Sequence, residues 1–145
     1  LILCHVAHRL YDSVTEIEEG AFSECRALTT VVLPNSLTEI SDYLFSDCTS
    51  LSDILIPASV TEIETGAFQR CTSLVSIVIP DSVTEIEDIA FSQCSALRSV
   101  LLPASVTEIG VGAFDKCPNL TLTVFRNSYA ERYAQRNHIP YTYAD

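Results

Sequence analysis

The residues able to do chemistry are few, and their spacing argues against catalysis. Cys4, His5 and His8 form a C-H-x-x-H group near the start of the chain, which combines side-chain types that bind zinc. The group lies in a short apolar segment, a weak setting for a metal site, so we expect none there. The serines lack a G-x-S-x-G elbow, and the four glycines form no phosphate-binding loop. The sequence therefore predicts a protein that is not an enzyme and holds no metal or cofactor.

Five of the six cysteines recur every 23 residues, and so do five of the six phenylalanines. The two series are Cys25, Cys48, Cys71, Cys94, Cys117 and Phe22, Phe45, Phe68, Phe91, Phe114. In coils stacked about 4.8 Å apart, equivalent cysteines point in parallel, farther apart than the Cβ separation of about 3.8 Å that a disulfide prefers. We therefore expect these five to be small buried hydrophobic residues rather than disulfides or metal ligands. Cys4 falls outside the register and is a candidate free thiol.

The same interval divides the chain into five repeats. These cover residues 13–35, 36–58, 59–81, 82–104 and 105–120. In the third, Ala67, Phe68 and Cys71 have the spacing of one inward-facing helical turn. The β-branched stretch 74–79 predicts a strand, which Pro80 ends. One repeat buries little alone, so the repeats must stack. The predicted fold class is an α/β solenoid with a parallel sheet and short helical turns.

The two ends differ. Residues 1–12 are expected to be the remnant of a preceding coil or an N-terminal edge strand, because His8 and Leu10 fall in register with Val31 and Leu33. On this interpretation the natural protein continues upstream. Residues 121–145 are expected to be a C-terminal cap, which terminal coils of a solenoid require.

The predicted cap has a helix and an extended edge. Ser128 and Glu131 form an S-x-x-E capping box, and Asn137 suits a left-handed stop. An apolar face over the last coil is predicted from Tyr129, Ala130, Tyr133 and Ala134, followed by an extended segment with Ile139, Tyr141 and Tyr143. Four tyrosines gather here, so an aromatic ligand site is the alternative to a purely structural cap.

The charge of the chain is strongly negative and partly periodic. Nineteen acidic against eight basic residues give a net charge of −11, which excludes nucleic acid and anionic membranes as favoured partners. Glutamates recur in two columns, Glu16, Glu39, Glu62, Glu85, Glu108 and Glu18, Glu64, Glu87. Two interpretations stay open: Ca²⁺ bridging between adjacent carboxylates, or a solvated acidic stripe that prevents lateral association.

The predicted sheet supplies the candidate binding site. Strand alternation sends an apolar column of Val32, Leu55, Val78 and Leu101 outward, flanked by Thr30, Asp53, Ser76 and Ser99. An aligned exposed apolar column is typical of an interaction surface. Neither Trp nor Tyr occurs in this column, so a protein segment is a better partner than a carbohydrate.

The pattern SVTEI-x-x-x-AF-x-x-C-x-x-L-x-x-I-x-IP resembles the BspA-like leucine-rich repeat of bacterial and protist cell-surface proteins. The tail NSYAERYAQRNHIPYTY is similar to the ending common in that family. Serines stand where general leucine-rich repeats carry asparagine, at Ser36, Ser59, Ser82 and Ser105. The resemblance implies a right-handed superhelix with the sheet on its concave side, an extracellular or cell-surface location, and a binding or adhesive role without catalysis.

The predicted function is therefore a non-enzymatic, adhesin-like protein-binding module of a larger cell-surface or secreted protein. Its partner would be a host, matrix or cell-surface protein, bound through the concave sheet. Two alternatives remain: a structural spacer or stalk without its own ligand, and a solenoid that self-associates end to end through its uncovered N-terminal coil.

Overall fold

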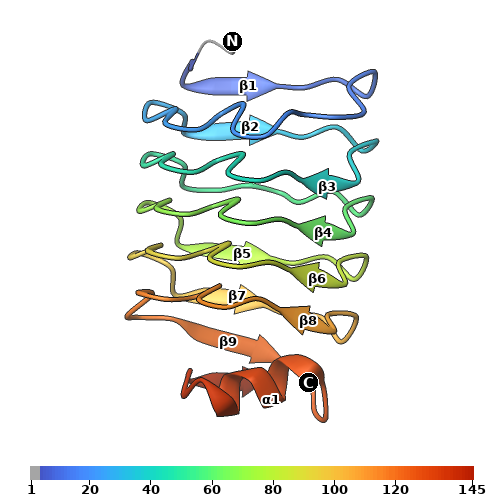
Figure 1. The fold of residues 1–145 in the computed structure, drawn as a ribbon, viewed down its shortest axis with the longest axis vertical. Helices are drawn as coiled ribbons and strands as arrows, with labels where there is room; N and C mark the ends of the chain where they lie inside the picture. Colours follow the sequence, from blue (N-terminus) through green and yellow to red (C-terminus); the bar gives the residue numbers. More distant parts are fainter. Residues whose placement is uncertain (1–3) are drawn as a thin grey trace.

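The computed structural model describes residues 4–145 as a stack of coils, each formed by one repeat (Figure 1). Along one side run the pair β1 (Ala7–Arg9) and β2 (Thr30–Val32) and a four-stranded parallel sheet of β5 (Ser76–Val78), β7 (Ser99–Leu101), β9 (Thr121–Val124) and β10 (Tyr141–Tyr143). A second parallel sheet contains β3 (Glu39–Ile40), β4 (Glu62–Ile63), β6 (Glu85–Ile86) and β8 (Glu108–Ile109). The chain is thus a parallel β-solenoid.

The strands confirm the 23-residue register. Ser76 pairs with Ser99, and Val78 with Leu101. The strand predicted over 74–79 is present as the shorter β5. The equivalent segment of the second repeat forms no strand, although Ile54 is buried there as the alternation requires. The second sheet was not predicted, because each of its strands contains only a glutamate and an isoleucine.

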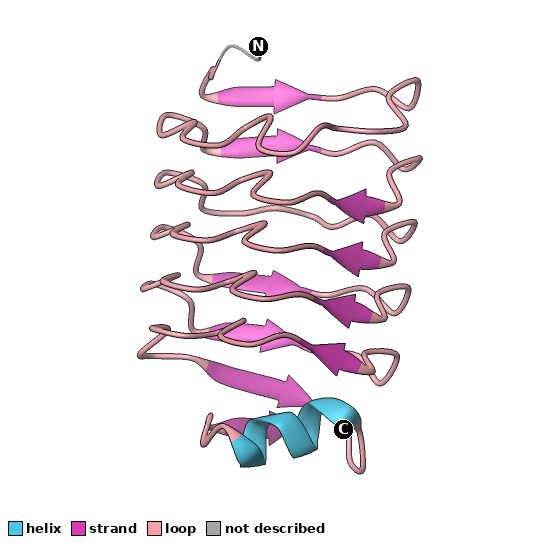
Figure 2. Cartoon of the chain, in the orientation of Figure 1, coloured by secondary structure: helices cyan, strands magenta, loops and turns pink. Residues whose placement is uncertain are grey.

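The predicted helical turns are wrong in detail. Each inward-facing segment is a run of hydrogen-bonded turns, and the only helix in residues 4–145 lies near the C-terminus (Figure 2). In the third repeat the Cys71 amide donates to the Phe68 carbonyl at 3.1 Å, which closes a four-residue turn. Arg70, between them, has a φ of 58°, and a left-handed residue cannot continue a right-handed helix. The same position is left-handed in all five repeats, at Glu24, Asp47, Arg70, Gln93 and Lys116.

The phenylalanine column forms the centre of the core. Neighbouring rings from Phe22 to Phe114 stack with centroids 5.2–5.5 Å apart. The column is covered at its first ring by His8, at 5.3 Å, and at its last by Tyr133, at 6.2 Å. Both covering rings meet the column edge-on, which is a favourable aromatic geometry. The end segments therefore continue the core packing beyond the repeats.

Four cysteines of the predicted column are thiols, of which Cys48, Cys71 and Cys94 are buried and Cys117 is half-buried. Each thiol donates to the carbonyl of the phenylalanine in the preceding coil, at 3.1–3.2 Å, in the pairs Cys48–Phe22, Cys71–Phe45, Cys94–Phe68 and Cys117–Phe91. Burial raises the pKa of Cys48 and of Cys94 to about 12. These side chains are therefore protonated, unreactive parts of the core.

The expectation of a free Cys4 and a merely hydrophobic Cys25 is wrong. The two residues form a disulfide, with their Cα atoms 4.9 Å apart. Stacking arguments apply only to residues in the same register, and Cys4 lies 21 residues before Cys25 rather than 23. The chain ahead of β1 departs from the coil path and brings Cys4 over the first repeat.

One turn position alternates between glycine and a larger residue along the stack. It is occupied by Gly20, Tyr43, Gly66, Ile89 and Gly112, all with φ between 50° and 67°. A Cβ atom on Gly66 would lie 2.4 Å from Cε1 of Tyr43. A Cβ atom on Gly112 would lie 3.3 Å from Cγ2 of Ile89. Each of these two glycines thus makes room for the large side chain of the coil before it.

The predicted C-terminal helix is present. Helix α1 (Tyr129–Arg136) is capped by Ser128, whose Oγ accepts a hydrogen bond from the Glu131 amide at 3.1 Å. Ala130, Tyr133 and Ala134 are buried against the last coil. The expected left-handed stop at Asn137 is wrong, because its φ is −98°. The left-handed residue is the next one, His138. Over residues 4–145, no helix has the length and apolar character needed to cross a membrane.

Candidate protein-binding face

The predicted apolar column lies on the outer surface of the side of the stack that is formed by β2, β5 and β7 and, around Leu55, by a segment without a strand. Val32 is 47% exposed, Leu55 82% and Val78 59%, while Leu101 is half-buried. The register extends the row at both ends, with Arg9 beside Val32 and Thr123 beside Leu101. We call the row of Val32, Leu55, Val78 and Leu101 the ridge.

The predicted flanking residues follow the ridge along one side. Thr30, Asp53, Ser76 and Ser99 are all exposed, and Thr121 continues their row in β9. Val75, which precedes this row, is 47% exposed and widens the apolar surface in the third repeat. Small hydroxyl side chains can donate or accept hydrogen bonds without covering the ridge. The whole arrangement is an apolar strip with an adaptable polar margin.

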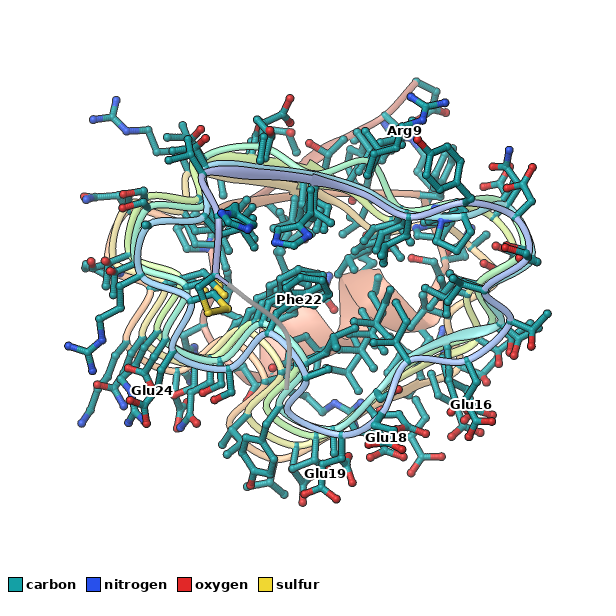
Figure 3. The ribbon with its side chains drawn as sticks, turned by 90° about the horizontal axis from the view of Figure 1, so that it is seen from above. Arg9, Glu16, Glu18, Glu19, Phe22 and Glu24 are labelled. Carbon is teal, nitrogen blue, oxygen red and sulfur yellow. A yellow bond between two sulfur atoms is a disulfide. The ribbon has the colours of Figure 1, made fainter. Side chains whose placement is uncertain are left out.

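The acidic columns lie away from this face. Viewed along the stack, Glu16, Glu18, Glu19 and Glu24 point outward on the side remote from Arg9 (Figure 3). Residues Glu39, Glu62, Glu85 and Glu108 lie in register along the second sheet. On the face itself, Asp53 is the one carboxylate among the predicted site residues. The face is therefore close to neutral in a strongly acidic protein.

Among residues 4–145, Glu39, Glu62 and Glu64 offer carboxylate oxygens within 4.8 Å of one another, close enough to share a cation. Glu64 already accepts a hydrogen bond from the Asp42 amide at 3.0 Å. Burial, followed by the charge of Glu39, raises the pKa of Glu64 above its ordinary value.

The next member of this column has a similar bond. Glu87 accepts from the Thr65 amide at 3.1 Å and from the Thr65 hydroxyl at 2.9 Å. Within the described chain, Glu64 and Glu87 thus join neighbouring coils. This role gives Glu64 and Glu87, two of the three glutamates in the second column, a structural function.

A hollow lies at each end of the stack. A cavity of about 540 Å³ opens at the first coil, lined by Cys4 and by the apolar side chains of Leu10, Val14, Ile17 and Ala21. The Cys4 sulfur lies in the disulfide, so the Cys4–His5–His8 group lacks a thiolate ligand. At the other end, Tyr129, Tyr133 and Arg136 line a hollow of about 350 Å³. Sequence reasoning found the tyrosines but missed the cavity at the first coil.

Comparison with known proteins gives one consistent result. The sequence profile of the BspA type leucine rich repeat region matches six copies over residues 7–129. No curated protein matches the chain. A leucine-rich repeat protein of T. pallidum is 36% identical, with a TM-score of 0.76, over 83% of this chain and 59% of that one.

Two other crystal structures are similar. A leucine-rich cell surface protein of Faecalibacterium prausnitzii is 35% identical, with a TM-score of 0.82, over 89% of this chain and 34% of that one. The pneumococcal vaccine antigen PcpA is 26% identical, with a TM-score of 0.73, over 83% and 31%. The chain thus spans between about a third and three-fifths of these relatives. By its repeats and its fold, the chain belongs to the BspA-type leucine-rich repeat family.

Proposed function

We propose that this chain is a non-enzymatic protein-binding module of a larger cell-surface or secreted protein, and that it binds its partner through the ridge. The observation that carries the proposal is the ridge itself, above all Leu55, which leaves 82% of its surface in water. One exposed apolar residue is ordinary, but aligned ones on neighbouring coils resemble the apolar centre of an interface.

The composition of the face favours a protein over other ligands. Protein interfaces surround an apolar centre with a polar rim that can form hydrogen bonds. Here the rim consists of Thr30, Ser76 and Ser99, with Asp53 as its charged member. This chain is strongly acidic, but the face is close to neutral. Another protein can therefore approach the face without meeting the glutamate columns.

The location outside the reducing cytoplasm has two supports. The Cys4–Cys25 disulfide is typical of oxidising compartments. One relative is named a cell surface protein and another a vaccine antigen, which describes those proteins and suggests the same setting for this chain.

The experiment measures binding to purified matrix and cell-surface proteins immobilised for interferometry. Replacing all four ridge residues, Val32, Leu55, Val78 and Leu101, by Asp should weaken binding at least about 30-fold, the loss of about 2 kcal/mol typical of an interface hot spot. Val111→Asp is the matched control, since Val111 is also 82% exposed but lies outside the ridge. Circular dichroism would verify that each variant is folded. Equal binding by the ridge variant and the wild type would refute the proposed face.

End-to-end self-association is the second candidate, because the first coil carries the apolar cavity lined by Leu10, Val14 and Ile17. Sedimentation equilibrium would detect it as a molar mass that rises with concentration and returns to the monomer value in Val14→Asp. A monomer at all concentrations that also binds no tested protein would favour the spacer alternative.

A further inference from the structure

The Cys4–Cys25 disulfide differs chemically from the rest of the cysteine column. Cys25 is fully buried, whereas Cys4 is exposed. The four other cysteines are thiols whose hydrogen atoms point to phenylalanine carbonyls of the preceding coil. The disulfide therefore joins an exposed residue to a buried one at the first coil, and it is the yellow bond in Figure 3.

We propose that Cys4 is a thiol-exchange site, at which a low-molecular-weight thiolate forms a mixed disulfide and releases the N-terminal strand β1. The attacking sulfur forms a bond to the Cys4 sulfur, and the bond to Cys25 breaks. The electron pair of that bond goes to the Cys25 sulfur, which takes up the proton that the attacking thiol gave up. One disulfide replaces another, so no separate oxidant or reductant is needed.

Exposure decides which sulfur is attacked. A thiolate must approach the disulfide along the line of the S–S bond, from the side opposite the leaving sulfur. Cys4 is exposed, so a thiolate can approach this residue from solvent. Cys25 lies within the core and has no accessible surface. The incoming group therefore ends on Cys4, and Cys25 becomes the thiol.

Besides the disulfide, non-covalent contacts hold this segment: β1 pairs in parallel with β2, and the His8 ring packs on Phe22. Val6 accepts hydrogen bonds from the amide and the hydroxyl of Thr29, at 2.7 and 2.9 Å, and the Leu10 amide donates to Val32 at 2.9 Å. Side chains on both sides of β1 are largely in water, with Val6 59% and Tyr11 68% exposed. Among the described strands β1 pairs with β2 alone, so we infer that this end strand opens more readily once the covalent link is lost.

Release of β1 would change the end of the solenoid. The His8 ring covers Phe22, and Leu10 and Cys4 form part of the wall of the 540 Å³ cavity. Movement of this segment would expose the first phenylalanine of the column and open the cavity. The proposed modification thus controls whether the first coil presents a covered or an apolar end. It stands independently of the proposed ridge interface.

The test treats the native chain with glutathione and maps the adducts by peptide mass spectrometry. We expect one adduct, on Cys4, with Cys25 recovered as a thiol. The column cysteines should react only after denaturation, and they are Cys48, Cys71, Cys94 and Cys117. Adducts on Cys25, or on column cysteines in the native chain, would overturn the assignment of Cys4 as the exchange site.

Hydrogen exchange then measures the release of β1. Loss of a link that spans 21 residues should accelerate exchange of the Leu10 and Thr29 amides by about 100-fold. The matched controls are the Ile79 and Arg98 amides, which make the equivalent hydrogen bonds in central coils and should not change. Unchanged exchange at Leu10 and Thr29 in the Cys4 adduct would overturn the release of β1.

A variant provides a second route to the same state. Cys4→Ser should show the fast exchange without glutathione and take up no adduct, whereas Cys117→Ser, which removes a column thiol, should exchange like the wild type at Leu10. Slow exchange in Cys4→Ser would also refute the proposal. Because the wild-type adduct gives the same readout, poor folding of the variant would leave the test intact.

Discussion

Replacing Gly66 by alanine tests the alternation of glycine and large residues along the stack. The added Cβ atom would lie 2.4 Å from Cε1 and 2.5 Å from Cδ1 of Tyr43, so the ring must move. Overpacking of this kind costs about 1–3 kcal/mol. The φ of +62° adds about 1 kcal/mol for an alanine in the left-handed region. We expect Gly66→Ala to lower the free energy of unfolding by about 2–4 kcal/mol.

Gly20→Ala separates the two contributions. Gly20 has nearly the same φ, +63°, but the nearest atom to its added Cβ would be that of Ser23, at 3.8 Å. Only the backbone contribution of about 1 kcal/mol applies there. In the double variant Tyr43→Ala/Gly66→Ala the ring is gone, so the effects of the single changes should not add.

Urea denaturation followed by far-ultraviolet circular dichroism would supply these free energies. The double-mutant cycle compares changes at one place in the stack, so it does not depend on the position of Gly20 in the first repeat. Equal losses in Gly20→Ala and Gly66→Ala, or additive losses in the cycle, would refute the contact between Tyr43 and Gly66 as the cause.

Other changes have equally definite outcomes. Phe68→Ala should lower the free energy of unfolding by about 3–5 kcal/mol in urea denaturation, because a ring stacked on both sides is lost. Ser59→Ala should lower the free energy of unfolding by about 1 kcal/mol in the same assay, because the Ser59 hydroxyl donates to the Leu37 carbonyl. Ser82→Ala should lower it less or raise it, because the buried Ser82 hydroxyl has no partner among the described residues. The midpoint of thermal unfolding should rise as the pH falls from 7 toward 4.5, because the pKa of Glu64 is raised in the folded chain and its protonated form therefore favours the fold. The midpoint should fall again below pH 3.8, because Asp47, whose pKa is lowered by Arg70, is then protonated and loses that pairing. The midpoint should be the same in Ca²⁺ and in EGTA, because Glu64 already bonds the neighbouring coil; a rise with Ca²⁺ would restore the cation hypothesis.

Features that repeat every 23 residues could be predicted from the sequence. The inward Phe68 and Cys71, the outward Val78 and the pairing of Ser76 with Ser99 all follow from one interval and strand alternation. The position of the ridge on an exposed sheet face follows in the same way. In the stack, the neighbours of a residue in the adjacent coils are the equivalent residues of the adjacent repeats. The repeat pattern in the sequence therefore determines the tertiary contacts.

The predictions from sequence failed where the backbone conformation or the path of the chain does not follow from residue type. Arg70 is left-handed, but arginine gives no sign of such a conformation, so the turn was mistaken for a helix. The disulfide depends on the path of the chain before β1, which lies outside the repeat. The two-residue strands such as β4 are too short for alternation to reveal, because only the stacking of the coils aligns them.

The alternation at the turn position has a consequence for how such a protein can change its length. Its sequence repeats every 23 residues, but the fit of Tyr43 over Gly66 and of Ile89 over Gly112 repeats every second coil. Deleting the coil of Gly66 alone would set Tyr43 directly against Ile89, two large left-handed residues with no glycine between them. Deleting two successive coils would preserve the order. Duplication and loss of repeats in this region should therefore be tolerated more readily in pairs than singly.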